Sequence, residues 1–288
     1  MGGVTQVWDS PTQIGSGTAL VAPVARVSEA RYLEAIDPVD KAIVLAFKSS
    51  YLGAEIPNRF VAEYVRRNPE KMIGFAGIDP LERDWREELR IAQDELGLKG
   101  VVISPEMQAF HPSDSRAMRL YEQCAQRRMP ILVEQDHRHP KAKMQYAAPT
   151  LLDDVAQAFP DLRIVIARLG HPWVAQTVVL LAKHPQVYAD VAGLLPQPWL
   201  SYTALLAAYE YGVMDKLLFG SDFPVRYPAA CIEALYSINQ FSQGSNLQTI
   251  PREHLRGIVE RDALALLGIS SPSVPDSKPK RPIFAHDE

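Results

Sequence analysis

Only two cysteines, Cys124 and Cys231, occur in the 288 residues, which is too few for a disulfide-stapled scaffold and fits a reducing compartment. No apolar stretch reaches the ~20 residues of a membrane-spanning helix, and the first residues lack the basic and then apolar pattern of a signal peptide. The net charge of −4 comes from 30 basic and 34 acidic residues, with no basic block in the region expected to fold. We therefore expect a soluble, cytoplasmic protein with neither a nucleic acid nor a membrane as partner.

A glycine-rich G-x-G-x-x-G turn is also missing after the first candidate strand, which disfavours a dinucleotide-binding sheet. What the sequence does contain is a repeated unit, in which a short β-branched apolar run is followed by a stretch with helical apolar spacing. The predicted strands are Val4–Trp8, Ala42–Phe47, Ile73–Ile78, Val101–Ile103, Ile131–Glu134, Ile164–Ala167, Val187–Asp190 and Leu217–Gly220. The predicted helices are Pro57–Arg67, Trp85–Glu95, Ser115–Arg127, Leu151–Ala158, Val174–Lys183, Leu200–Tyr211, Ala230–Phe241 and Arg252–Leu267.

Apolar strands that alternate with helices indicate a parallel sheet buried on both faces, and eight such units predict an α/β fold of the TIM-like (β/α)₈ barrel type. We assign residues 1–269 to this single barrel domain, with the stretch Arg261–Leu267 closing its base. Residues 270–288 are rich in Ser, Pro and Lys and lack periodicity, so they are predicted to be a flexible tail. An open doubly wound sheet is the alternative fold.

Charged residues close four successive predicted strands: Glu134, Arg168, Asp190 and Asp222. In a (β/α)₈ barrel the chemistry takes place at the C-terminal ends of the strands and in the loops that follow them. Charged groups are seldom buried unless they are paired or functional. The four residues are therefore candidates for a functional site, although each could also be a solvated loop residue.

Several segments at these strand ends resemble the amidohydrolase-related family, in the branch similar to aminocarboxymuconate-semialdehyde decarboxylase. The segments that carry the resemblance are Ala148–Asp154, Arg168–Trp173, Val187–Val191, Leu217–Pro224 and Leu266–Ile269. It extends from about residue 41 to residue 269, and the Phe-Gly-Ser-Asp-Phe-Pro segment after a buried strand is its most specific part.

The resemblance implies a distorted barrel that holds one Zn²⁺ or similar ion. In the family the ligands are a His-x-His pair at strand one, a histidine at the end of strand five and an aspartate at the end of strand eight. A further histidine at strand six handles the substrate or a proton. The implied chemistry is polarisation of the substrate by the metal together with an activated water molecule.

The sequence departs from this pattern, because none of its histidines lies in the first 110 residues. Val4 and Gln6 stand where the His-x-His pair is expected. Glu134 takes the place of the strand-five histidine and Arg168 that of the first histidine at strand six, so that only Asp222 remains of the expected polar site. The seven histidines are His111, His137, His139, His171, His184, His254 and His286.

These replacements suit one another electrostatically, since Arg168 would repel a metal ion but would give Glu134 and Asp222 a cationic partner. We predict an ion triad of these three residues as the catalytic group, without the family's usual mononuclear metal site. Arg168 would bind a carboxylate or polarise a carbonyl, and Asp222 would act as the general base toward water. The predicted substrate-binding residues are Lys48, His171 and Trp173.

The leading functional hypothesis is a hydrolase, or a C–C lyase, that acts on a small carboxylated or lactone-like substrate. A second hypothesis is a non-catalytic barrel that binds a ligand or a partner. A third is a hydrolase with a displaced zinc site formed by His137, His139, His171 and Asp222. We expect no cofactor under the first two hypotheses, and a homodimer is possible by analogy with other large barrels.

Overall fold

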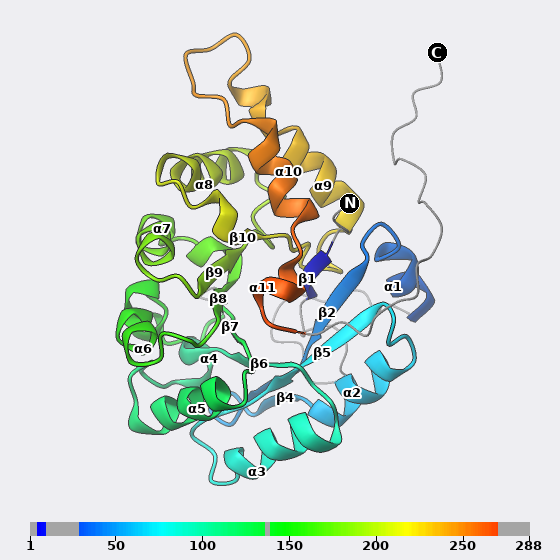
Figure 1. The fold of residues 1–288 in the computed structure, drawn as a ribbon, viewed down its shortest axis with the longest axis vertical. Coiled ribbons are helices and arrows are strands. Elements are labelled where there is room, and N and C mark those ends of the chain that lie inside the picture. The colour runs from blue at the N-terminus through cyan, green and yellow to red at the C-terminus, as the bar shows by residue number, and fades with distance from the viewer. Residues whose placement is uncertain (1–4, 10–28, 136–138, 270–288) are drawn as a thin grey trace.

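Eight parallel strands form one curled sheet at the centre of the molecule (Figure 1). The computed structural model describes residues 5–9, 29–135 and 139–269. The strands follow one another in the sheet in chain order: β1 (Thr5–Asp9), β2 (Lys41–Leu45), β5 (Met72–Gly77), β6 (Gly100–Ile103), β7 (Ile131–Val133), β8 (Ile164–Ile166), β9 (Val187–Asp190) and β10 (Leu217–Leu218). The fold is thus the predicted TIM-like barrel, distorted in that no ladder joins β10 to β1 among these residues.

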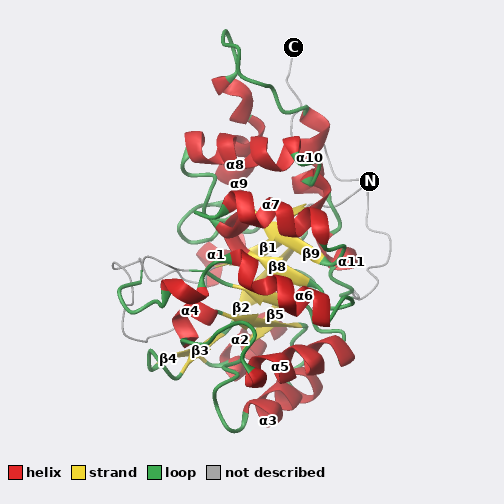
Figure 2. Ribbon diagram, turned by 90° about the vertical axis from the view of Figure 1, so that its left-hand side faces the viewer, coloured by secondary structure: helices red, strands yellow, loops and turns green. Residues whose placement is uncertain are grey.

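Helices surround this sheet, and most of them follow the strands as the apolar spacing predicts (Figures 1 and 2). They are α1 (Glu29–Ala35), α2 (Asn58–Arg66), α3 (Trp85–Arg90), α4 (Pro105–Gln108), α5 (Ser115–Gln126), α6 (Asp153–Ala158), α7 (Val174–Lys183), α8 (Pro198–Glu210), α9 (Pro228–Tyr236), α10 (Arg252–Glu260) and α11 (Ala263–Leu266). No helix in the described part of the chain is long and apolar enough to cross a membrane.

Alternating side chains of the strands divide the core into an inner and an outer part. Ile43 and Leu45 of β2 belong to an inner cluster that also contains Leu132 of β7 and Leu264 of α11. Val44, between them in the chain, belongs to the outer cluster beneath the helices. Successive side chains of a strand point to opposite faces of the sheet. Both faces are buried here, so most residues of such a strand are apolar, which explains the continuous apolar runs in the sequence. The terminal helix closes the base, as the sequence predicts.

The prediction of one final helix over Arg252–Leu267 was wrong, because the chain breaks between α10 and α11. Arg261 adopts extended backbone angles, φ −69° and ψ 138°. Asp262 then caps α11, since its side chain accepts a hydrogen bond from the Ala265 N–H at 2.9 Å. An aspartate at this position satisfies a backbone donor that a helix start leaves free. The break lets the short helix turn onto the inner core.

The predicted second strand, Ala42–Phe47, ends at Leu45 instead. Phe47 starts a new strand, β3 (Phe47–Ser49), which pairs antiparallel with β4 (Ala54–Ile56). Gly77 permits the bend, because a Cβ atom at this position would lie 2.5 Å from the Phe47 Cα. Figure 2 shows this hairpin and α11 at opposite ends of the barrel. The tail predicted for residues 270–288 lies outside the described residues.

Candidate functional site

Three charged side chains meet at the C-terminal rim of the barrel. Glu134 directly follows β7, Arg168 lies two residues after β8, and Asp222 follows β10. Arg168 Nη2 lies 3.3 Å from Glu134 Oε1 and 3.3 Å from Asp222 Oδ2. The side chains of Glu134, Arg168 and Asp222 are only 14%, 15% and 10% exposed. The structure therefore brings the three predicted catalytic residues into one ionic network, whereas their catalytic roles stay a prediction.

The backbone that presents this network adopts an unusual conformation. Arg168, Leu169 and Asp222 have φ angles of 55°, 49° and 58°, all in the left-handed region. Side-chain-bearing residues rarely adopt this region, and each instance costs about 1 kcal/mol or more unless neighbouring contacts hold it. Arg168 has such contacts at both ends: its N–H donates to Asp190 Oδ1 at 3.0 Å, and its Nη1 donates to the Gln135 carbonyl at 3.0 Å.

Asp190, the last residue of β9, anchors the turn that carries Arg168. Its Oδ1 accepts hydrogen bonds from the backbone N–H groups of Arg168 and Ala192, at 3.0 and 2.9 Å. Its Oδ2 is buried and has no hydrogen-bond partner among the described residues. Burial raises the pKa of Asp190 well above its ordinary value, and the negative charge of Glu134 raises it further. The hydrogen bond from the Arg168 N–H lowers the pKa but does not cancel these two effects. Asp190 is thus a buried positioning residue for Arg168.

Gly193 forms the wall behind the Arg168–Asp222 ion pair. Its φ of +68° is in the left-handed region. A Cβ atom at this position would lie 3.2 Å from Arg168 Nε, tighter than most Cβ contacts, and 3.4 Å from Asp222 Oδ2. A glycine adopts this backbone angle without strain and leaves the ion pair uncrowded. Neither Gly193 nor Gln135 belongs to a recognisable motif, so the sequence carries no signal for their part in the site.

Lys48 lies in β3 and has its own partners. Its Nζ is 2.5 Å from Glu82 Oε2 and 2.9 Å from Glu88 Oε2. Burial alone would lower the pKa of Lys48, but the hydrogen bonds and charges of the two glutamates raise it above its ordinary value. Asn58 Nδ2 also donates to Glu88 Oε1, at 3.1 Å. The structure thus gives Lys48 two acidic partners, and its role in substrate binding stays a prediction.

His171 and Trp173 lie in the turn that follows Arg168. Both are partly buried, and their backbone N–H groups donate to the Arg168 and Gly170 carbonyls at 3.0 and 2.8 Å. These bonds tie the two residues to the turn that presents Arg168. Their predicted contacts with a substrate stay predictions.

The hypothesis of a displaced zinc site involves His137, which lies outside the described residues. His139 is buried, and its Nδ1 accepts a hydrogen bond from the Lys141 N–H at 3.2 Å. Within the described ranges, no three or more His, Cys, Asp or Glu side chains are grouped in a way that could hold a metal ion. The described residues therefore lend this hypothesis no support.

Comparison with known proteins identifies the family of this chain. The family model described as amidohydrolase matches residues 23–269. The chain therefore belongs to the amidohydrolase family, as the segments at its strand ends predict. No curated protein matches the chain by sequence.

Solved structures with the same fold include enzymes of several kinds. An uncharacterised TIM-barrel protein from Bordetella bronchiseptica is 21% identical and has a TM-score of 0.66, with 82% of this chain and 81% of that chain covered. The 2,6-dihydroxybenzoate decarboxylase from Rhizobium is 15% identical at a TM-score of 0.66, covering 93% and 99%. A probable 2-pyrone-4,6-dicarboxylic acid hydrolase from Acinetobacter baumannii, with citric acid bound, is 15% identical at a TM-score of 0.65, covering 93% and 100%. At these identities the likeness concerns the fold.

Proposed function

We propose that this protein is a hydrolase that opens an ester or lactone bond in a small carboxylated substrate, with Arg168 and Asp222 in place of a metal centre. The observation that carries the proposal is the Glu134–Arg168–Asp222 network at the rim. It combines a fixed positive charge with a carboxylate, at the place where barrels of this type carry out their chemistry. The left-handed backbone at Arg168 and Asp222 adds support, because strain of this kind clusters at functional sites.

The described residues at this rim do not fit the mononuclear metal centre that the family implies. Such a centre requires neutral imidazoles and a carboxylate around an open position. Here a guanidinium lies 3.3 Å from each of the two carboxylates, and it keeps its positive charge at any ordinary pH. A divalent ion between Glu134 and Asp222 would meet that charge at close range. The proposed reaction therefore uses no metal ion.

In the proposed reaction, Asp222 takes a proton from a water molecule as the water oxygen forms a bond to the carbonyl carbon of the substrate. Asp222 Oδ2 accepts from Arg168 at 3.3 Å, which leaves Oδ1 for the water. Arg168 stabilises the negative charge that develops on the carbonyl oxygen. The acyl C–O bond then breaks, and the leaving alkoxide recovers the proton from Asp222. The products are a carboxylic acid and an alcohol, or its keto form when a pyrone ring opens.

The similar structures fit this substrate class. One is a probable hydrolase of a pyrone dicarboxylic acid, and another is a decarboxylase of a dihydroxybenzoate. Both names denote small cyclic acids, which matches a site that contains a guanidinium. Cleavage of a C–C bond in such an acid is the alternative reaction, and the experiment below separates it from hydrolysis by the product formed.

The test is a screen of carboxylated lactones, aryl esters and hydroxybenzoates, followed by ultraviolet absorbance and by mass spectrometry of the products. We expect hydrolysis of at least one carboxylated lactone or ester, with kcat lowered by about 100-fold or more in Asp222→Asn. Asp153→Asn is the matched control, because Asp153 pairs with Lys183 at the surface and its loss leaves the rim intact. Loss of carbon dioxide would assign C–C cleavage instead. Absence of turnover across the screen would refute the proposal and favour a non-catalytic barrel.

A further inference from the structure

A cavity of about 460 Å³ opens at the end of the barrel opposite the rim described above. Its lining includes Pro130, Arg163 and Gln186, the residues that immediately precede β7, β8 and β9, and Gly268, which follows α11. Parallel strands all begin at one end of a barrel, so this cavity and Arg168 are separated by the full length of the strands. In Figure 1, α11 faces the viewer in front of the strands and marks this end.

Arg163 is the unusual residue of the cavity. Its Nε is buried and has no hydrogen-bond partner among the described residues. Arg90 and Arg256 each pair with a glutamate at the surface, whereas no carboxylate in the described part of the chain pairs with Arg163. A guanidinium has five N–H donors and binds carboxylates and phosphates with two parallel hydrogen bonds. Arg163 can therefore bind an anion, and no carboxylate among the described residues fills that role.

The backbone around Arg163 is shaped to its side chain. Gly268 has a φ of +65°, and a Cβ atom at this position would lie 2.7 Å from Arg163 Nη1 and 2.8 Å from Cζ. The absence of a side chain at Gly268 thus makes room for the guanidinium against the end of α11. The carbonyl of Arg163 accepts a hydrogen bond from the Ile131 N–H at 2.9 Å, which ties the residue before β8 to the first residue of β7.

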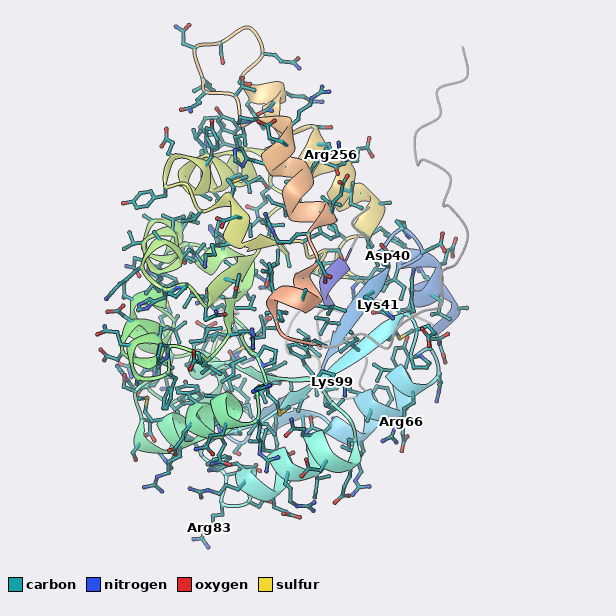
Figure 3. The ribbon with its side chains drawn as sticks, viewed as in Figure 1. Asp40, Lys41, Arg66, Arg83, Lys99 and Arg256 are labelled. Carbon is teal, nitrogen blue, oxygen red and sulfur yellow. The ribbon has the colours of Figure 1, made fainter. Side chains whose placement is uncertain are left out.

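The remaining lining gives the cavity a positive balance and an apolar wall. Arg128 supplies a second cation, and Asp161 is the carboxylate among the lining residues. Met129 and Leu162 are buried apolar residues of the same lining. Lys99, which Figure 3 labels, immediately precedes β6 and so lies at the same end of the barrel, outside the lining. The volume lies within the range of about 300–1,000 Å³ that small-molecule sites occupy.

We propose that this cavity binds a small molecule that carries a carboxylate or phosphate group on a compact apolar body. The oxyanion lies against Arg163 and Arg128, and the apolar body lies against Met129 and Leu162. The site is separate from the one proposed for hydrolysis, so its ligand does not compete with the substrate.

The test is calorimetric titration of the full-length protein with inorganic phosphate and with benzoate, at constant ionic strength. We expect saturable binding of one of the two anions at one site per chain, and the anion that binds identifies the oxyanion of the ligand. Arg163→Gln should weaken binding about tenfold or more. Arg59→Gln, an exposed arginine on α2, is the matched control for one lost charge and should change binding less than twofold.

A second variant keeps the proposal testable if Arg163→Gln does not fold. Asp161 is exposed, so Asp161→Asn should fold normally, and it should tighten anion binding about two- to fivefold because a repelling charge is removed. Failure of both anions to bind saturably at about 20 mM, a concentration far above most specific dissociation constants, would overturn the proposal. Equal weakening by Arg163→Gln and Arg59→Gln would overturn it as well, because binding would then depend only on the net charge of the surface.

Discussion

Replacing Arg168 with methionine isolates the energetic role of the ionic network. Each contact joins opposite charges 3.3 Å apart, a gross Coulomb energy of about 5 kcal/mol at an effective dielectric constant of ~20. The cost of burying the three charges offsets much of this gain. In Arg168→Met the cation is lost while Glu134 and Asp222 remain buried together. We therefore expect the free energy of unfolding to fall by about 3–5 kcal/mol.

The same variant should show a characteristic pH dependence. Two buried carboxylates that face each other without a cation have pKa values above those of the unfolded chain. Their repulsion is absent at about pH 4, where carboxyl groups are largely protonated, and it grows as the pH rises through the raised values. The stability deficit of Arg168→Met relative to the wild type should therefore be smallest near pH 4 and largest near pH 8.

Urea denaturation followed by circular dichroism, at several pH values, measures both quantities. The triple variant Glu134→Gln, Arg168→Met, Asp222→Asn serves as the control for packing, because it removes all three charges at similar volume. It should recover about 2 kcal/mol or more of the loss. A deficit below about 1 kcal/mol in Arg168→Met, without pH dependence, would show that the three charges are separately solvated, and the reasoning would fail.

Three further perturbations test the surroundings of the network. Asp190→Ala leaves two buried N–H groups without an acceptor and should cost about 2–4 kcal/mol in urea denaturation, whereas Asp190→Asn keeps an oxygen acceptor. The pKa of Asp190 is raised in the folded state, so the wild type loses stability as the pH rises above the ordinary pKa of a carboxyl group. The stability of Asp190→Asn relative to the wild type should therefore increase from pH 4 to pH 8. Gly193→Ala should lower both stability and kcat, while Gly212→Ala, with a φ of +70° but open space around it, should cost only about 1 kcal/mol of backbone strain and leave kcat unchanged. Treatment with EDTA should leave turnover unchanged, and a loss of activity that Zn²⁺ restores would contradict the metal-free proposal.

The barrel could be predicted from the sequence because its signals are local. Each strand is a short apolar run, and strand direction follows from the intervening helices. Once the fold is known, the residues after β7, β8 and β10 must share one rim, and therefore Glu134, Arg168 and Asp222 could be grouped before any coordinates. This grouping needed only the order of the strands.

Other parts of the site depend on contacts that no local pattern encodes. A left-handed conformation at Arg168 has no signal in the sequence, since only Gly170 in that turn is a residue that favours it. The anchoring by Asp190 follows from that conformation and was equally hidden. The sequence predicts Lys48 at the end of a straight strand, but the chain bends at Phe47 because Gly77 gives it room. The partners of Lys48 then come from the loop and helix after β5, far along the chain.

The charge of the network leads to a last prediction, about how a carboxylated substrate binds. Glu134 and Asp222 contribute −2 and Arg168 contributes +1, so the three side chains carry a net charge of −1 when all are ionised. A substrate carboxylate that approaches Arg168 therefore meets a guanidinium already balanced by two carboxylates. Neutralising one of those carboxylates removes the excess negative charge and leaves Arg168 to the substrate.

Glu134→Gln removes one of the two carboxylate charges and should lower KM for a carboxylated substrate by about three- to tenfold. Glu134 is the carboxylate that can be neutralised without loss of the general base, so kcat should be retained. Calorimetric titration of the wild type and of Glu134→Gln with a non-reactive dicarboxylate measures the change in the dissociation constant directly. An unchanged dissociation constant in Glu134→Gln would mean that the substrate carboxylate is held by a cation other than Arg168, which would leave Arg168 to act on the carbonyl oxygen alone.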